Sequence, residues 1–128
     1  MSTPAEPDSF SMLPTDTHIQ QSLVNDPADI FQSHIIELCD IISSDVVAVC
    51  NACVSFELIG PETRSYIMTA KGASDYEKAT KLLYDIELQL KSRINKQKYL
   101  SNVIEAFLCV NNSNLSIIAE KLKNSFLY

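Results

Sequence analysis

The sequence predicts an all-α protein built as one bundle of six helices. Apolar residues recur at intervals of three and four over long runs, which is the pattern of one helical face. No bounded segment alternates apolar and polar residues with the period of two that a strand needs. Glycine occurs only twice, which argues against a fold that depends on many turns with positive φ. A chain of 128 residues, 46% of them hydrophobic, suits one domain with one core.

Residues 1–26 have the composition of a disordered acidic tail. They contain three prolines and four acidic residues, with no Lys or Arg. A short apolar island, Phe10 to Leu13, is either a linear docking motif or simply part of the tail. The helical bundle is expected to span residues 27–128, where 12 acidic and 10 basic residues leave a net charge of only −2.

The first helix has a clear local start. Asp26 offers a side-chain acceptor at the N-cap, and Pro27 follows where its missing N–H costs nothing. The expected inner face then consists of apolar residues and one histidine: Phe31, His34, Ile35, Leu38, Ile41 and Ile42. We therefore expect one helix from residue 27 to about Ser43.

The second helix is expected to begin after Ser44 or Asp45, either of which can act as its N-cap. Its apolar face includes Cys50 and Cys53, and it is expected to end near Leu58.

A short third helix follows a break in the pattern. Gly60 permits a sharp turn, and Pro61 with Glu62 suits the first turn of a helix. Gly72 stands where a C-cap glycine would end this helix.

The fourth helix has the strongest signals in the chain. Ser74 and Glu77 have the spacing of a capping box, in which each side chain satisfies the other residue's free N–H. Its expected inner face is Tyr76, Ala79, Leu82, Leu83, Ile86 and Leu90. The helix is expected to end near Lys91 to Arg93.

Lys96 opens a fifth helix, and a polar break at residues 111–114 separates it from a sixth. Six helices of about 10–18 residues with short connections predict a compact bundle.

Four segments resemble the caspase recruitment domains of the death-fold superfamily. DVVAVCNACVSFELIGPETRSYIM (45–68) resembles the passage from their second to their third helix. SDYEKATKLLYDIELQL (74–90) is similar to their fourth helix and its Lys-Ala-x-x-Leu-Leu core, while YLSNVIEAFLCV (99–110) and NLSIIAEKL (114–122) are similar to the last two. The resemblance covers about residues 27–126. It implies an antiparallel Greek-key bundle that works through contacts with other modules of the same kind.

The resemblance also implies two docking patches of opposite charge. The acidic patch corresponds to Asp45, Glu57 and Glu62 in the second and third helices. The basic patch falls on Lys78 and Lys81, three residues apart on one face of the fourth helix. The first helix lacks the base that many members carry there, so the fourth helix supplies this patch alone. The alternative is an ordinary solvated surface.

The densest positive region lies between the fourth and fifth helices. It contains Lys91, Arg93, Lys96 and Lys98. These cations can hold an acidic partner, a phosphate or a membrane surface, or they can simply stabilise a helix C-terminus.

No catalytic, metal or cofactor site is expected. The Cys50–Cys53 pair has no second ligand pair to complete a zinc site, and its apolar setting favours two core cysteines. Cys39 and His34 are five residues apart and do not share a helical face. There is also no glycine-rich phosphate loop.

We therefore expect a cytoplasmic adaptor or decoy in signalling assemblies of the apoptotic or inflammatory type, with no enzymatic activity. Its partners would be other death-fold proteins or copies of itself, in a homo-oligomer or filament. The acidic balance argues against nucleic acid, and no membrane partner is expected. The alternative is an unrelated helical bundle with a structural or dimerisation role, which would expose an apolar stripe.

Overall fold

The structure is a computed structural model that describes residues 26–127, and in this range the chain forms seven helices and no strand. The helices are α2 (Pro27–Ser33), α3 (Ile35–Ser43), α4 (Val46–Ser55), α5 (Pro61–Thr69), α6 (Asp75–Ser92), α7 (Lys96–Cys109) and α8 (Ser113–Leu127). The all-α prediction is confirmed for these residues. The predicted tail, with its island Phe10 to Leu13, lies outside the described residues.

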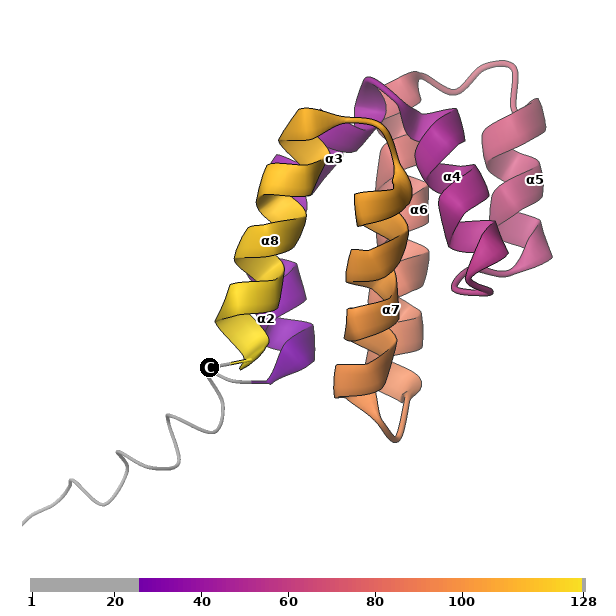
Figure 1. Cartoon of the computed structure of the whole chain (residues 1–128). Helices are drawn as coiled ribbons and strands as arrows, with labels where there is room; N and C mark the ends of the chain where they lie inside the picture. The colour runs from indigo at the N-terminus through magenta and orange to yellow at the C-terminus, as the bar shows by residue number, and fades with distance from the viewer. Residues whose placement is uncertain (1–25, 128) are drawn as a thin grey trace, which may run out of the picture.

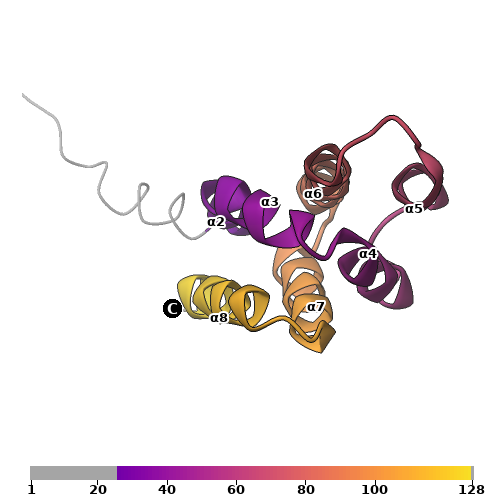
Figure 2. The same cartoon turned by 90° about the horizontal axis from the view of Figure 1, so that it is seen from above.

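From α3 to α8, successive helices run in alternating directions (Figure 1). α8 packs against α7 and against α2 and α3, so the two ends of the described chain lie side by side. α5 stands at the edge of the bundle and packs only against α4 and α6 (Figure 2). Its outer side is therefore not covered by any other described helix.

One apolar core holds these helices together. Its largest fully buried side chains come from six of the seven helices and include Phe31, Leu38, Ile67, Leu82, Leu100, Phe107 and Leu115. α4 contributes smaller side chains, Val49, Cys50 and Cys53, which are also fully buried. Each large apolar side chain removed from water contributes roughly 1.5–3 kcal/mol to folding.

The prediction of one unbroken first helix is wrong, because the chain leaves helical geometry at His34 (φ −108°, ψ 5°). The Ser33 hydroxyl donates to the Ile30 carbonyl oxygen at 2.7 Å, and His34 Nδ1 lies 3.0 Å from the same oxygen. Two side chains thus bond to the Ile30 carbonyl oxygen, which in a continuous helix would accept from the backbone N–H four residues later. This break divides the first of the six expected helices into α2 and α3.

The second helix ends at Ser55, earlier than the predicted end near Leu58. Glu57 adopts the left-handed conformation, with φ 57°. The Leu58 N–H then donates to the Cys53 carbonyl oxygen and the Glu57 N–H to that of Val54, both at 2.9 Å. These two bonds form a Schellman turn, which satisfies the last carbonyl groups of α4.

Neither glycine has the role that the sequence predicts. Gly60 is extended (φ −80°, ψ 164°), a conformation open to any residue, and the left-handed position of this turn is Glu57. α5 ends at Thr69 with an extended Ala70 as its C-cap, and Gly72 has no positive φ. The predicted C-cap at Gly72 is therefore wrong.

Two predicted helix caps are confirmed, at Asp26 and at Ser74, whereas Asp45 stands at the N-cap of α4 without a side-chain hydrogen bond. Asp26 Oδ1 accepts from the Ala28 N–H at 2.9 Å. In the capping box, the Glu77 N–H donates to Ser74 Oγ at 3.1 Å, and the Ser74 N–H donates to Glu77 Oε1 at 2.8 Å. The predicted end of this helix is also confirmed, because α6 ends at Ser92.

One tyrosine that the pattern assigns to an inner face lies at the surface instead. Tyr76 is 49% exposed, whereas Ala79 and Leu82 beside it in the pattern are fully buried. An aromatic ring at the flank of a helix can cover apolar surface while its hydroxyl group stays in water.

Among residues 26–127, no single helix has both the length and the apolar character needed to cross a bilayer. α3 and α4 meet that criterion only as a pair, and the chain bends by 111° between them.

Candidate interaction surfaces

The two lysines of the predicted basic patch lie about one turn apart on α6, and Lys81 contacts α5. Lys78 and Lys81 are both half-buried. The Lys81 ammonium group lies 6.0 Å from the centre of the Tyr66 ring on α5, within the range of a cation–π contact. We refer to Lys78 and Lys81 as the basic pair.

The three predicted acidic residues do not form one patch. Asp45 is the N-cap of α4, whereas Glu57 lies just beyond the other end of that helix. Ten residues of helix separate the two residues by about 15 Å. Glu57 and Glu62 do lie near each other, and both are exposed at the turn between α4 and α5. We refer to residues 56–62 as the acidic turn.

A hydrogen bond fixes the height of the acidic turn along α6. The Gly60 N–H donates to Asp85 Oδ2 at 3.3 Å, so this turn lies level with the middle of α6. Asp85 follows Lys78 by seven residues, or about 10 Å of helix. The basic pair and the acidic turn therefore lie on the same side of the bundle at different heights, and not on opposite faces.

Three of the four cations from Lys91 to Lys98 contact other groups of the chain: Lys91, Arg93 and Lys96. Lys91 Nζ lies 3.3 Å from Glu87 Oε2. Lys96 Nζ donates to the carbonyl oxygens of Lys91 and Arg93 at 3.1 and 3.0 Å. These oxygens are free at the end of α6, so Lys96 has the helix-end role that the sequence left open.

Arg93 lies with its guanidinium carbon 4.7 Å from the centre of the Tyr99 ring, at the start of α7. The next residue, Ile94, is fully exposed, at 105% of its reference area. Sequence reasoning missed Ile94, although one signal was present: it is the only apolar residue between Lys91 and Lys98. We refer to residues 91–98, which hold the four cations around Ile94, as the basic tip.

A pocket of about 250 Å³ opens at the acidic turn. It is lined by three apolar side chains, a glycine and two charged residues: Val54, Ile59, Pro61, Gly60, Glu57 and Arg64. A Cβ atom added to Gly60 would meet no atom within 4 Å, so the space beside this residue is open.

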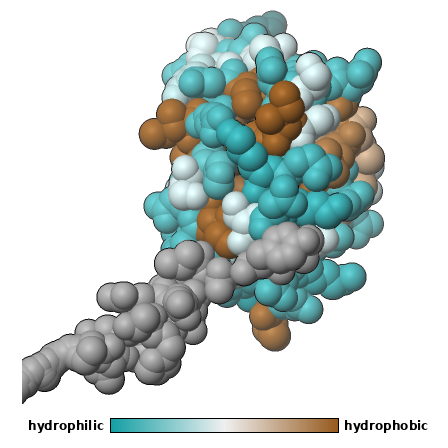
Figure 3. All heavy atoms as spheres, turned by 60° about the vertical axis from the view of Figure 1, so that its left-hand side comes forward, coloured by the Kyte–Doolittle hydropathy of each residue, from teal (hydrophilic) through white to brown (hydrophobic). Residues whose placement is uncertain are grey.

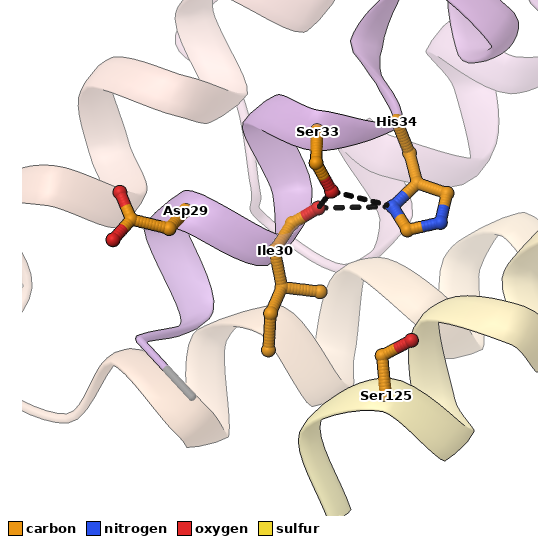
Figure 4. A pocket seen from close by; sticks show the side chains of 5 residues that line it. All are labelled: Asp29, Ile30, Ser33, His34 and Ser125. Atoms are coloured by element: carbon orange, nitrogen blue, oxygen red, sulfur yellow. Dashed lines mark hydrogen bonds between the residues drawn. The ribbon is translucent and has the colours of Figure 1, made fainter. Parts of the chain in front are cut away.

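A second hollow, of about 420 Å³, lies between α2 and α8 (Figure 4). Asp29, Ile30, Ser33, His34 and Ser125 line it. The Ser33 hydroxyl donates to the Ile30 carbonyl oxygen at 2.7 Å and also lies 3.1 Å from His34 Nδ1. Asp29 points away from the imidazole ring (Figure 4), so it does not orient that ring as the third member of a catalytic triad would.

The prediction that Cys50 and Cys53 are core residues is confirmed, because both are fully buried in α4. Burial raises the pKa of the Cys53 thiol to about 12, which keeps it protonated near neutral pH. Cys39 is also buried, with its Sγ 3.2 Å from Thr80 Oγ1. In the described part of the chain, no three His, Cys, Asp or Glu residues are grouped so that they can hold a metal ion.

Apolar side chains on the face over α8 form separate groups among hydrophilic ones (Figure 3). α6 exposes a longer series on its outer side. Tyr76, Tyr84 and Leu88, at spacings of eight and four residues, are 49%, 56% and 49% exposed. They fall on one helical stripe.

No family model matches this chain, and neither does any curated protein or solved structure. Proposals for its function therefore rest on the geometry and charge of its surface.

Proposed function

We propose that this chain is a homotypic interaction module of the death-fold type, most like a caspase recruitment domain. It would act as an adaptor or decoy in signalling assemblies of the apoptotic or inflammatory kind. The alternating helix directions support this proposal, because they leave six antiparallel rods when α2 and α3 count as one broken helix. An antiparallel Greek-key bundle is the arrangement that the sequence resemblance implies.

The observation that carries the proposal is the separation of charge along α6. The acidic turn, which carries Glu57 and Glu62, is bonded to this helix at Asp85, about 6 Å beyond Lys81 and about 10 Å beyond Lys78. Another module with the same layout can place its acidic turn on this basic pair. Such complementarity steers the encounter and fixes its register. The contact is heterologous, so it can repeat into an open assembly.

An adaptor and a decoy differ in how many of these patches work. An adaptor needs both, because each copy must bind one neighbour and offer a surface to the next. A decoy needs only one, since it occupies the end of an assembly and stops its growth. The sequence carries both charges, and the absence of a base from α2 and α3 leaves the basic side weaker.

The proposal includes no catalytic residue and no cofactor. It is supported by the geometry around His34, where the neighbouring carboxylate of Asp29 points away from the ring, although the Ser33 hydroxyl lies 3.1 Å from Nδ1. A cytoplasmic location belongs to the same proposal, because all four cysteines are free thiols.

The test uses the purified full chain, imaged by negative-stain electron microscopy and sized by sedimentation from low to high salt. Salt-sensitive filaments would support an adaptor. A monomer that blocks filaments of another death-fold domain would support a decoy.

The variant Lys78→Glu with Lys81→Glu tests the basic pair directly. Its control is Lys71→Glu with Lys123→Glu, which changes the net charge equally at sites outside the basic pair. The first variant should lose assembly or partner binding, and the control should keep it. If both behave alike, the basic pair is not a docking surface.

A second candidate function is dimerisation through the apolar stripe of α6, favoured by the exposure of Tyr84 and Leu88. A dimer of this kind would be insensitive to salt, because it buries apolar surface. Tyr84→Glu with Leu88→Glu would separate it into monomers, whereas the double lysine variant would leave it intact.

A further inference from the structure

One end of the bundle carries an apolar knob. Ile94 projects fully into solvent from the basic tip. Four cations and no acidic residue occur between Lys91 and Lys98. A fully exposed isoleucine is unfavourable in water, and burial on a partner would recover most of its transfer free energy.

The acidic turn, at the corresponding end of α4, carries a hollow. Val54, Ile59 and Pro61 form the apolar part of its pocket of about 250 Å³. This volume lies just below the roughly 300–1,000 Å³ of small-ligand pockets, so the hollow suits a small apolar group.

The charges around the knob and the hollow are complementary. Three carboxylates belong to the acidic turn or contact it: Glu57, Glu62 and Asp85. Of these three, only Glu57 lines the pocket, together with one cation, Arg64. With Glu62 and Asp85 beside it, the region as a whole has three negative charges against one positive. The basic tip has the opposite sign, and such a match favours contact between them.

The knob and the hollow are neighbours within one molecule. Tyr99, at the start of α7, donates a hydrogen bond of 2.7 Å to the carbonyl oxygen of Leu58 in the acidic turn. Arg93 of the basic tip stacks on the ring of the same tyrosine. At this end α6 and α7 extend beyond α4 and α5, so the surface forms a step (Figure 1).

A step with a knob on its high side and a hollow on its low side fits a second copy turned by 180°. Each copy then inserts its knob into the other's hollow, as a two-fold interface requires. We propose that Ile94 docks in the pocket at the acidic turn of a second copy of this chain, and that the contact is reciprocal. This inference rests on the proposed homotypic function and uses the same acidic turn, with the basic tip in place of the basic pair.

The first test measures the dimer dissociation constant of the full chain by sedimentation equilibrium. Ile94→Asp should raise that constant at least about tenfold, since it removes the burial of one large apolar side chain in each contact. Ile36→Asp is the matched control, because Ile36 is 74% exposed on α3 and lies outside this surface. Gly60→Leu should weaken the dimer in the same way by filling the hollow, because the space beside Gly60 is open.

The second test exchanges charges between copies. Lys98→Glu alone and Glu62→Lys alone should each weaken the dimer, because each places like charges at both contacts. A mixture of the two variants should form a heterodimer, because one contact is then reversed in sign and the other is native. Failure of the mixture to associate more strongly than either variant alone would overturn the reciprocal contact.

These outcomes separate the inference from the proposed function. If Ile94→Asp chains still self-associate and Lys78→Glu with Lys81→Glu chains do not, the inference fails and the proposed function stands. If the wild-type chain is a monomer at high concentration, the inference fails, and binding to other death-fold modules decides the function. Ile94-dependent binding of that monomer to phosphatidylserine vesicles would show that the knob serves an anionic bilayer instead.

Discussion

The hydroxyl group of Tyr99 donates a buried hydrogen bond of 2.7 Å to the carbonyl oxygen of Leu58, which is 41 residues earlier in the chain. This bond ties the start of α7 to the irregular turn that follows α4. It satisfies a carbonyl group that has left the helix, and it holds the acidic turn and the basic tip at the same end of the bundle. The Tyr99 side chain is thus part of the core and also sets the relative position of the acidic turn and the basic tip.

Tyr99→Phe should lower the free energy of unfolding by about 1–2 kcal/mol, because the Leu58 carbonyl stays buried without its donor. The aromatic ring that stacks with Arg93 is retained, so the change isolates the hydrogen bond. Urea denaturation measures the difference. Tyr84→Phe is the control, because Tyr84 is 56% exposed, and it should cost less than about 0.5 kcal/mol. Equal losses in the two variants would show that the bond contributes nothing.

Stability should fall at alkaline pH because two buried groups resist ionisation. Burial raises the pKa of Cys53 from 9.0 to about 12, and burial raises the pKa of Tyr99 above its ordinary value of 10.0. Both groups are neutral when protonated, so their contribution to the free energy of unfolding is complete below their pKa values in the unfolded chain. It is lost as the pH rises from about 9 toward the folded values.

Urea denaturation in a series of buffers checks this prediction. The free energy of unfolding should be level between pH 7 and about 9 and decrease above that. The Tyr99→Phe variant should lose less stability than the wild type above about pH 10, because it lacks one of the two groups. Parallel curves would show that Tyr99 ionises as easily in the folded chain as in the unfolded one.

Thiol labelling should distinguish one cysteine from the other three. Cys109 is exposed, whereas Cys39, Cys50 and Cys53 are buried. Because only an accessible thiolate reacts, a disulfide reagent at neutral pH should modify one thiol quickly and the rest only as the chain unfolds. Cys109→Ser should remove the fast phase. A second fast thiol in that variant would show that α3 or α4 opens locally.

Helix starts were predictable because an N-cap is a local interaction. Asp26 with Pro27 and Ser74 with Glu77 carry their signal within four residues, and the structure contains both caps. Helix ends were less predictable. The left-handed residue after α4 is Glu57 and not a glycine, and it is held by bonds that depend on the whole turn. The break at His34 likewise comes from side chains competing for one carbonyl oxygen.

The proposed surfaces show the same limit. Sequence spacing was enough to place Lys78 and Lys81 on one face of a helix. It was not enough to separate Asp45 from Glu57, because that separation depends on where α4 ends. The exposure of Ile94 could not be predicted from sequence spacing. It depends on how α6 packs against α7, because the folded turn directs this side chain away from both helices.

The capping box offers a direct measure of local helix energetics. Ser74→Ala removes the acceptor of the Glu77 N–H and should lower the free energy of unfolding by about 1 kcal/mol. Ser101→Ala is the control, because Ser101 is exposed within α7, where alanine is the better helix former. That control should be neutral or slightly stabilising by thermal denaturation. A stable Ser74→Ala variant would mean that packing of α6 alone fixes its start.

A substitution at Glu57 can separate effects on stability from effects on association, because this residue has both a strained backbone and a charged side chain. Its φ of 57° lies in the left-handed region, which costs a residue with a side chain about 1–2 kcal/mol. Glu57→Gly should therefore raise the free energy of unfolding by about 0.5–1 kcal/mol, after the greater freedom of glycine in the unfolded chain is subtracted. The same change removes a carboxylate from the acidic turn, so it should weaken association.

Glu62→Gly is the matched control, with the same substitution and the same loss of charge. Glu62 lies in the first turn of α5, where glycine disfavours the helix, so this variant should be less stable by up to about 1 kcal/mol. Denaturation in urea should thus give opposite signs for the two variants, while sedimentation shows weaker association for both. If association follows stability instead, and Glu57→Gly binds more tightly, the carboxylate at Glu57 does not belong to the docking surface.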